Sequence, residues 1–424
     1  MRRMLRKLSS VLLIYLVLLG CFVGPIMHGT ATYRPLTKKH TLMSQSNIDD
    51  PFERQILIIM RFAGFPSLST GIIRDDELIY TQGYGYYDLT EEQIPNKHTI
   101  YCLASVTKTI VGTALMQLYD QGLFDLDDDV NTVLPFDLRN PYFPDDSITF
   151  RMLLSHTSSL NTNSRNEYYW MNFSGDPPFS FFPDPYLREF LLPDGKYYHD
   201  KVWSDTVRPG ETAMYANVGF DLISYLIELL SGEPFLEYCQ QHIFDPLEMK
   251  NTSFNLSTLP LDQVAIPYHH FLGSYYQIND LPSIFGSSYD DRYWRMRGFP
   301  AGGLYSSIHD LSHFLIAHMN HGMYKNISIL SPDTIELMHT IDRDNEIRYG
   351  LSWMEYPITQ TLSATGHGGD VVGVDTWMLY NESTDTGVIY LANGNPYYGL
   401  MPTVGFIAVQ YLLYLLFTTN PISI

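Results

Sequence analysis

Three stretches of the chain carry apolar residues at the spacing of an α-helix. The first is Asp49–Phe62, the second is 106–121 with Gly122 at its end, and the third follows Asn217 and stops before Gly232. The pattern therefore predicts three helices. Their apolar stripes are Ile56, Ile59 and Met60; then Val111, Ala114, Leu115 and Leu118; then Leu222, Ile223, Leu226, Ile227 and Leu230.

Strand-like runs lie at both ends of the chain, whereas helical patterns dominate its middle. The runs, taken in chain order, are 68–73, 77–80, 349–354, 376–380 and 387–392. Turn residues 74–76 separate the first pair, and the polar turn Asn381–Asp385 separates the last pair. We expect the two ends to share one sheet, with the middle inserted as a helical lobe and an active site between sheet and lobe.

The last apolar stretch, Pro402–Phe417, predicts a long helix. It resembles a membrane tail, but Gln410 interrupts it and a strand directly precedes it. We interpret it as a buried helix that covers the sheet.

Composition narrows the class of protein. The 424 residues are 45% hydrophobic and 17% charged, which is too apolar for a disordered chain, and three cysteines are too few for a disulfide scaffold. The net charge of −20 argues against a nucleic-acid partner, which would need a basic surface.

The N-terminus carries a targeting pattern. Four basic residues within 1–7 precede an uncharged run, Val11–Met27, and small residues follow at 29–31. We expect either a signal peptide cleaved near residue 31 or a signal anchor through residues 8–27. Leu18–Cys21 also resembles a bacterial lipobox. A polar spacer, 32–48, separates this segment from the rest of the chain.

Glycosylation sequons support export. Five Asn-x-Ser/Thr triplets occur, at Asn172, Asn251, Asn255, Asn326 and Asn381. We expect a glycosylated protein that is secreted or held in the secretory pathway. Cys102 and Cys239 form one bridge or remain two buried thiols; the sequence leaves both open.

The first candidate for chemistry is Ser105-Val106-Thr107-Lys108, at the start of the helix predicted over 106–121. Residues three apart share a helix face, so Lys108 would stand over Ser105 and take its proton. The helix N-terminus favours a developing oxyanion and disfavours a protonated lysine. Alone, the motif also fits a solvated helix face.

Two further motifs add candidate groups. In Tyr215-Ala216-Asn217 the phenol could relay a proton and the Asn217 amide could position both Lys108 and a substrate carbonyl. In Gly366-His367-Gly368-Gly369, the glycines would let a strand edge approach substrate, and His367 could donate to substrate or to Tyr215. Each motif alone also fits a plain structural role.

The order and spacing of these motifs resemble the serine β-lactamase and penicillin-binding-protein superfamily, and more closely its beta-lactamase-related branch of class C β-lactamases, D-alanyl-D-alanine carboxypeptidases, D-aminopeptidases and esterases. The resemblance runs from about Asp49 to Phe417. Connecting segments also resemble the family's motifs: Leu126–Asp129, Ile148–Leu160, Pro209–Glu211, Pro300–Ser307 with Asp310-Leu311, and Tyr349–Trp353.

The resemblance implies a β-lactamase/transpeptidase-like α/β (α+β) fold, in which helices flank an antiparallel sheet. It implies one hydrolase domain over 49–424, with the helical lobe at about 120–300. It also implies Ser105 as nucleophile, Lys108 as its activating partner and Tyr215 as proton relay.

The resemblance also implies the substrate-binding groups. Asn217 would position substrate, and the backbone N–H of Asp370 would complete the oxyanion hole. The Asp370 carboxylate is expected beside the cleft. No metal or cofactor is implied, and no His-Glu-x-x-His pattern occurs in the sequence.

Two residues depart from the family pattern. His367-Gly368-Gly369 stands where relatives carry Lys-Thr-Gly, and Ser159 stands where glycine is usual. A neutral His367 would bind a substrate carboxylate less strongly than lysine. We therefore expect small esters, amides or peptides as substrates rather than β-lactams.

Three functions remain open: a serine hydrolase, a secreted binding protein without turnover, and an acyltransferase. We expect a small-molecule or peptide-like substrate, and the sequence does not define the oligomeric state. The aromatic, proline-rich stretch 161–208 is interpreted either as a cleft wall that selects apolar acyl groups or as a surface excursion.

Overall fold

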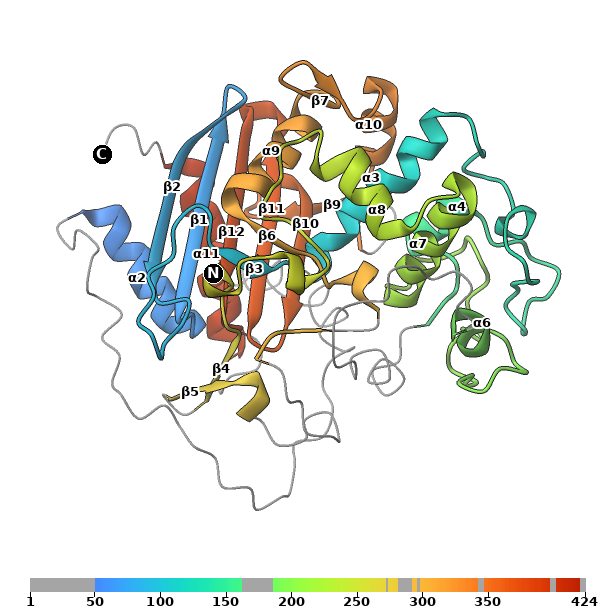
Figure 1. Ribbon diagram of the computed structural model, residues 1–424, viewed down its shortest axis with the longest axis horizontal. Helices are drawn as coiled ribbons and strands as arrows, with labels where there is room; N and C mark the ends of the chain where they lie inside the picture. Colours follow the sequence, from blue (N-terminus) through green and yellow to red (C-terminus); the bar gives the residue numbers. More distant parts are fainter. Residues whose placement is uncertain are drawn as a thin grey trace.

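The computed structural model describes residues 50–161, 186–271, 274–280, 292–295, 298–341, 347–396 and 402–419. A six-stranded antiparallel sheet forms the centre of the molecule (Figure 1). In spatial order its strands are β2 (Glu77–Gly85), β1 (Ser67–Arg74), β12 (Thr386–Ala392), β11 (Val374–Asn381), β10 (Ser363–Val371) and β9 (Met354–Pro357).

The two ends of the chain meet inside this sheet. Strand β1 pairs with β12, so that Leu68 lies opposite Ala392 and Arg74 opposite Thr386. Most of the chain, residues 75–385, lies between these two strands in sequence. The sequence-based prediction that both ends share one sheet is confirmed.

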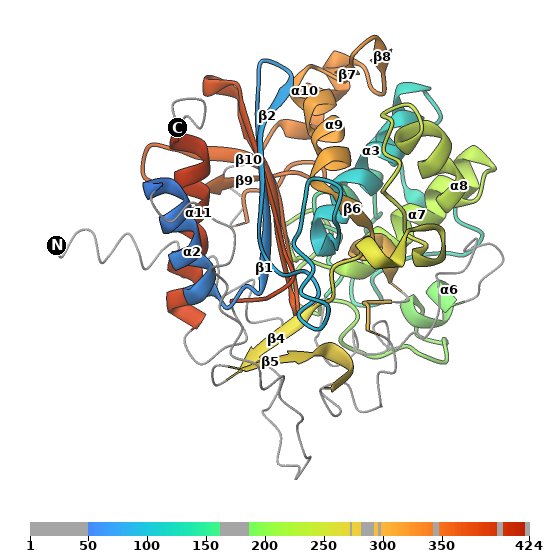
Figure 2. The ribbon, with the colours of Figure 1, turned by 60° about the vertical axis from the view of Figure 1, so that its left-hand side comes forward.

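Helices cover both faces of the sheet, as Figure 2 shows edge-on. On one face α2 (Pro51–Ala63) and α11 (Pro402–Thr418) pack together over the apolar side chains of β11 and β12. On the other face α3 (Thr107–Asp120) and α9 (Ile308–Met319) contact the sheet. The predicted long helix at the end of the chain is therefore a covering helix. Within the described ranges, no helix combines the length and the apolar composition needed to cross a bilayer.

The helical lobe is built around α7 (Asn217–Ser231), which packs on α3 and on two short neighbours. The described residues also form the α-helices α4 (Phe150–Leu154), α6 (Tyr186–Leu191), α8 (Phe235–Cys239) and α10 (Pro332–His339). The same part of the chain holds three small two-stranded sheets: β3 (Ile100–Cys102) with β6 (Tyr305–Ser307), β4 (Tyr268–Phe271) with β5 (Ser274–Gln277), and β7 (Met323–Tyr324) with β8 (Ile327–Ser328).

Local chemistry explains where the predicted helices begin and end. The Asp50 carboxylate accepts the N–H of Phe52 at 2.7 Å and so caps α2. Gly64 ends α2 at φ 70°, and Gly232 ends α7 at φ 74°, a left-handed conformation that glycine adopts without strain.

The predicted strand over 349–354 is wrong. Arg348 and Ser352 have φ values of 49° and 69°, which interrupt an extended run, and only Met354 begins a strand. The Ser352 side chain packs where Gly112 leaves room, because a Cβ at Gly112 would lie 2.1 Å from Ser352 Oγ. Contact with α3 therefore shapes this segment.

The Gly-His-Gly-Gly motif lies inside a strand. Gly366–Gly369 belongs to β10, and each of its residues pairs with a residue of β11. Three glycines in four residues resemble a turn in sequence. Here they allow close contacts with neighbouring backbone and aromatic atoms.

Cys102 and Cys239 are free and buried. Burial raises the pKa of the Cys102 thiol to about 11 and also raises that of Cys239. Of the two alternatives, the pair of buried thiols is the one observed.

Candidate active site

Ser105 lies where β3 turns sharply into α3. Ala104, the residue before it, has φ 45°, which is uncommon for a residue with a Cβ. A single 3-10 turn, Ala104–Val106, then leads into the helix. Ser105 is partly exposed, while the residues on either side of it are buried. The turn thus presents the hydroxyl at the helix N-terminus.

Lys108 reaches back to this hydroxyl. Its Nζ lies 3.0 Å from Ser105 Oγ and also donates to the carbonyl oxygen of Ala301. The side chain is fully buried, with Nζ 5.0 Å from the centroid of the Tyr215 ring and 5.6 Å from that of Phe220. An unprotonated amine at this distance is placed to accept the hydroxyl proton.

Tyr215 enters the site from the segment that leads into α7. Its ring centroid lies 6.3 Å from that of His367 on β10. Asn217 is the first residue of α7 and is partly exposed. The structure therefore brings Ser105, Lys108, Tyr215 and His367 together from three elements far apart in sequence.

Strand β10 contacts the serine turn at Gly369. A Cβ at this position would lie 2.1 Å from the carbonyl oxygen of Leu103 and 3.0 Å from the Ser105 nitrogen. On β11, Thr376 fastens the same turn by donating its hydroxyl to Leu103 O at 2.6 Å. Any side chain at position 369 would separate the strand from the serine.

Gly368 faces the other side of β10, where an added Cβ would lie 2.8 Å from the Trp377 ring. β9 pairs only with Ser363–Gly366 of β10, so β9 does not cover the edge of the following residues. The backbone N–H of Asp370 belongs to this later part of the strand, as an oxyanion-hole donor would require.

His367 is oriented differently from the prediction. Its Nδ1 lies 2.6 Å from Gly368 O, which can only accept, so Nδ1 carries the proton. Its Nε2 then accepts the Tyr349 hydroxyl at 2.8 Å. Both ring nitrogens are thus engaged within the protein, and the expected donation to Tyr215 or to a substrate is not made. Burial and the nearby Lys108 lower the pKa of His367 to about 3, so the ring is neutral.

Asp370 also lies differently from the prediction. Successive side chains of a strand alternate between faces, so Asp370 points away from the face of His367 and Gly369. Asp370 lies opposite Asp375 in the register of β10 with β11. Its carboxylate accepts a hydrogen bond from Asn395 Nδ2 at 2.7 Å. Its carboxylate therefore lies on the face of β10 opposite to that of Gly369, which contacts the serine turn.

Asp370 should make stability depend on pH. Burial raises its pKa to about 7, although the bond from Asn395 acts in the opposite sense. The fold thus favours the protonated carboxyl. The stability that Asp370 contributes is fully present below about pH 4 and is lost as the pH rises through about 7. We expect Asp370→Asn to stabilise the protein by about 1–3 kcal/mol at pH 8, since part of the side chain stays accessible, and to change little at pH 4.

Thermal or urea unfolding at the two pH values measures this difference. The same substitution at the exposed Asp262 serves as the matched control. An equal effect of Asp370→Asn at pH 4 and pH 8 would contradict the raised pKa.

Ser159, the second departure from the family pattern, has φ 62°, a conformation that favours glycine. The serine is fully buried, and its hydroxyl accepts Asn140 Nδ2 at 2.9 Å. This bond gives the side chain a defined place in the lobe.

Several residues that shape the site were not identified from the sequence. Their segments were recognised as motifs, but their contacts arise only in the folded chain. They are the Ala301 carbonyl, His156 behind Tyr215, Tyr349 at His367, and Thr376 at the serine turn. Half of the proposed aromatic cleft wall, residues 162–185 of 161–208, lies outside the described residues. In the part of the chain that is described, no group of three or more His, Cys, Asp or Glu side chains could hold a metal ion.

Comparison with known proteins identifies the family. The model of the family described as Beta-lactamase matches residues 57–404. The chain belongs to this beta-lactamase family. The β-lactamase-like fold expected from the sequence is therefore confirmed, with its antiparallel sheet and flanking helices.

Two similar proteins each share about a quarter of their aligned residues with this chain. Protein flp of Staphylococcus aureus (strain MW2) is 25% identical over 84% of the chain, which spans only 64% of that relative's length. The octameric penicillin-binding protein homologue from Pyrococcus abyssi superposes with a TM-score of 0.65 at 25% identity, over 87% of this chain and 77% of that one.

The D-amino acid amidase from Ochrobactrum anthropi SV3, complexed with D-phenylalanine, has a TM-score of 0.64 at 20% identity, over 88% of this chain and all of that one. At this level of identity, the similarity concerns the fold alone.

Proposed function

We propose that this beta-lactamase-family protein is a serine hydrolase that cleaves esters or amides through an acyl-enzyme. The observation that supports this proposal most strongly is the buried Lys108 amine, which lies 3.0 Å from the Ser105 hydroxyl at the start of α3. A serine becomes nucleophilic when an adjacent base can accept its proton.

In the acylation step, Lys108, acting with Tyr215, takes the Ser105 proton as Oγ bonds to the substrate carbonyl carbon. The carbonyl oxygen becomes an oxyanion held by the N–H groups of Ser105 and Asp370. The intermediate then collapses: the bond to the leaving group breaks, and Tyr215 returns a proton to the departing oxygen or nitrogen.

In the deacylation step, water attacks the acyl carbon and gives its proton to the same pair of groups. The ester bond to Ser105 breaks, the acid leaves, and Oγ recovers a proton. Passing the acyl group to an alcohol or amine would use the same steps with a different acceptor.

The state of His367 supports a substrate without a carboxylate beside the scissile bond. Relatives with Lys-Thr-Gly place a positive charge there, whereas His367 is neutral and bonded to Tyr349 and Gly368. The two similar structures are named as a penicillin-binding protein homologue and a D-amino acid amidase. Both names are consistent with an acyl donor of the ester or amide type.

A substrate panel tests this proposal. We expect p-nitrophenyl esters and D-amino-acid amides to be turned over faster than a chromogenic cephalosporin, and Ser105→Ala to lose all of these activities. Cephalosporin turnover above ester and amide turnover would refute the inference from His367. Activity that persists in Ser105→Ala would refute the assignment of the nucleophile.

We further propose that the protein acts in the secretory pathway or outside the cell. The basic and apolar N-terminal pattern and the five sequons support this location. Asn326 is exposed at the turn between β7 and β8, where a glycan would meet no obstacle from the hairpin. Mass analysis before and after glycosidase treatment of protein from a eukaryotic host tests it, and an unchanged mass would contradict it.

A further inference from the structure

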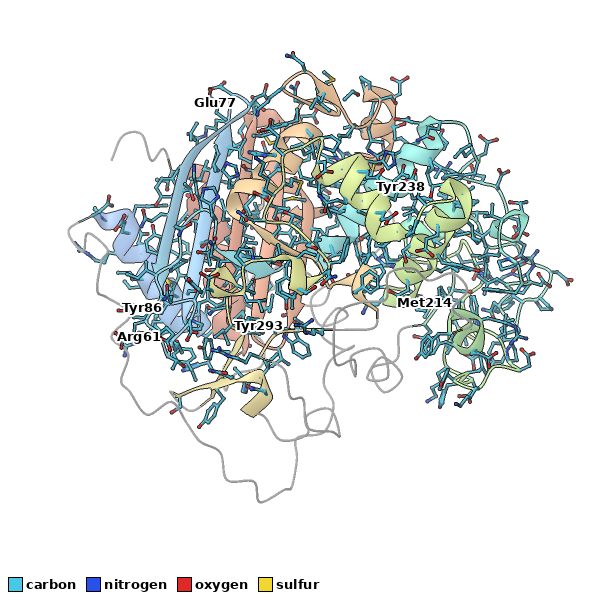
Figure 3. All side chains as sticks on the ribbon, viewed as in Figure 1. Arg61, Glu77, Tyr86, Met214, Tyr238 and Tyr293 are labelled. Atoms are coloured by element: carbon cyan, nitrogen blue, oxygen red, sulfur yellow. The ribbon has the colours of Figure 1, made fainter. Side chains whose placement is uncertain are left out.

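One residue holds the backbone on both sides of Tyr215. The N–H of Met214 donates to the carbonyl oxygen of His156 at 2.7 Å, and the N–H of Ala216 donates to His156 Nδ1 at 3.2 Å. Figure 3 labels Met214 where this segment approaches α7. Because the two bonds bracket Tyr215, they fix its Cα relative to His156.

The His156 ring also fixes the phenol ring. The two ring centroids lie 4.3 Å apart with planes 35° from each other. Tyr349 and Phe220 pack around the same imidazole, with centroids at 4.7 Å and 5.2 Å, and His156 is 1% exposed. The histidine ring therefore packs between the Tyr215 side chain and Phe220 of the helical lobe.

The backbone that carries His156 is itself well anchored. The residue follows α4 with φ 59°, a left-handed conformation in which histidine and asparagine are enriched. The next residue, Thr157, accepts the N–H of Gly210 at 2.7 Å, and Arg151 of α4 donates its N–H to Leu126 O at 2.8 Å. These hydrogen bonds hold His156 in place within the helical lobe, so a residue that contacts His156 is held relative to the lobe.

His156 is a neutral ring with a defined proton. Its Nδ1 accepts a backbone N–H, so the proton lies on Nε2, which is buried and has no hydrogen-bond partner among the described residues. Burial, then the charge of Lys108, then His367 keep its pKa well below the usual range. The ring adds no charge to compete with Lys108.

We propose that His156 is a positioning residue, which holds the Tyr215 phenol near Lys108 through two hydrogen bonds from the backbone around Tyr215 and one tilted ring contact. The inference rests on the proposed function, in which Tyr215 moves the proton. A displacement of about 1 Å at a reacting group can cost about 100-fold in rate. Loss of these contacts should therefore lower kcat and leave substrate binding largely intact.

Two substitutions separate the contacts. His156→Ala removes the ring and the Nδ1 acceptor. His156→Asn keeps an acceptor near the Nδ1 position and tolerates the positive φ. The matched control is His318→Asn: His318 is equally buried, and its Nε2 lies 3.0 Å from Thr113 Oγ1, two turns along α3 from Ser105. The preferred ester substrate is assayed, with kcat expressed per folded molecule from circular dichroism.

We expect His156→Ala to lose about 30- to 100-fold in kcat with KM within about 3-fold, and His156→Asn to recover most of the loss. His318→Asn should melt at a lower temperature and keep kcat within about 2-fold of the wild type. A kcat unchanged in His156→Ala, a loss confined to KM, no recovery in His156→Asn, or an equal kcat loss in the control would each overturn the proposal.

The two proposals fail in distinguishable ways. Wild-type protein that is not acylated at Ser105 contradicts the hydrolase itself. Wild-type protein that is acylated at Ser105, at a rate that His156→Ala leaves unchanged, contradicts only the positioning role.

Discussion

Replacing Lys108 by methionine is expected to lower kcat by about 10³- to 10⁴-fold, the upper range for loss of a general base. Methionine nearly matches the lysine stem in length and can fill the same buried space. It removes only the amine that lies 3.0 Å from Ser105 Oγ. Because methionine fills the buried space without a polar group that needs a partner, we expect the variant to remain folded.

Steady-state turnover of the preferred ester, together with the single-turnover rate of acylation, measures this loss. Lys325→Met serves as the control, since Lys325 is exposed and paired with Glu248. We expect kcat of the control to stay within about 2-fold of the wild type. A loss below about 10-fold in Lys108→Met would mean that another group activates Ser105.

Gly369→Ala is the second substitution with a large expected effect. The new Cβ would lie 2.1 Å from Leu103 O and 3.0 Å from the Ser105 nitrogen, so β10 must move away from the serine turn. The Asp370 N–H would move with it, and loss of one oxyanion donor costs about 10²- to 10³-fold in kcat. The same displacement should also destabilise the fold by about 1–3 kcal/mol.

The control for this effect is Gly219→Ala in α7, close to Asn217. A Cβ at Gly219 meets its nearest atoms at 3.9 Å and 4.0 Å, which is ordinary contact distance. Alanine favours the helix more than glycine does, so we expect unchanged kcat and a stability gain of up to about 1 kcal/mol. If Gly369→Ala and Gly219→Ala behaved alike in kcat and in melting temperature, the close approach of β10 to Ser105 would not matter for catalysis.

The spacing of apolar residues predicted those elements that pack through a regular apolar stripe. The apolar stripe of α7 and the glycine after it defined that helix, and the same features defined α3. The run Pro402–Phe417 was predicted as a covering helix because Gln410 interrupts its apolar side chains, and Gln410 indeed hydrogen-bonds Tyr356. Strand β10 was not among the predicted strands, since its glycines serve close contacts with Leu103, Trp377 and Met378 that the local pattern does not reveal.

The candidate site was predictable to the extent that it follows local spacing. Ser105 and Lys108 are three apart on one helical turn, so their contact follows from the sequence. The orientation of His367 depends on Tyr349, and that of the Asp370 carboxylate on the register of β10 with β11. Only tertiary structure sets these two features, so the spacing of the motifs does not predict them.

Covalent labelling of Ser105 tests the central claim most directly. Protein lacking residues 1–31 is treated with a fluorophosphonate probe, digested, and the adduct is located by mass spectrometry, with Ser105→Ala treated in parallel. The account predicts one adduct, on the peptide that carries Ser105, and none in the variant. An adduct at another residue, labelling that persists in Ser105→Ala, or no labelling of the wild type would contradict it.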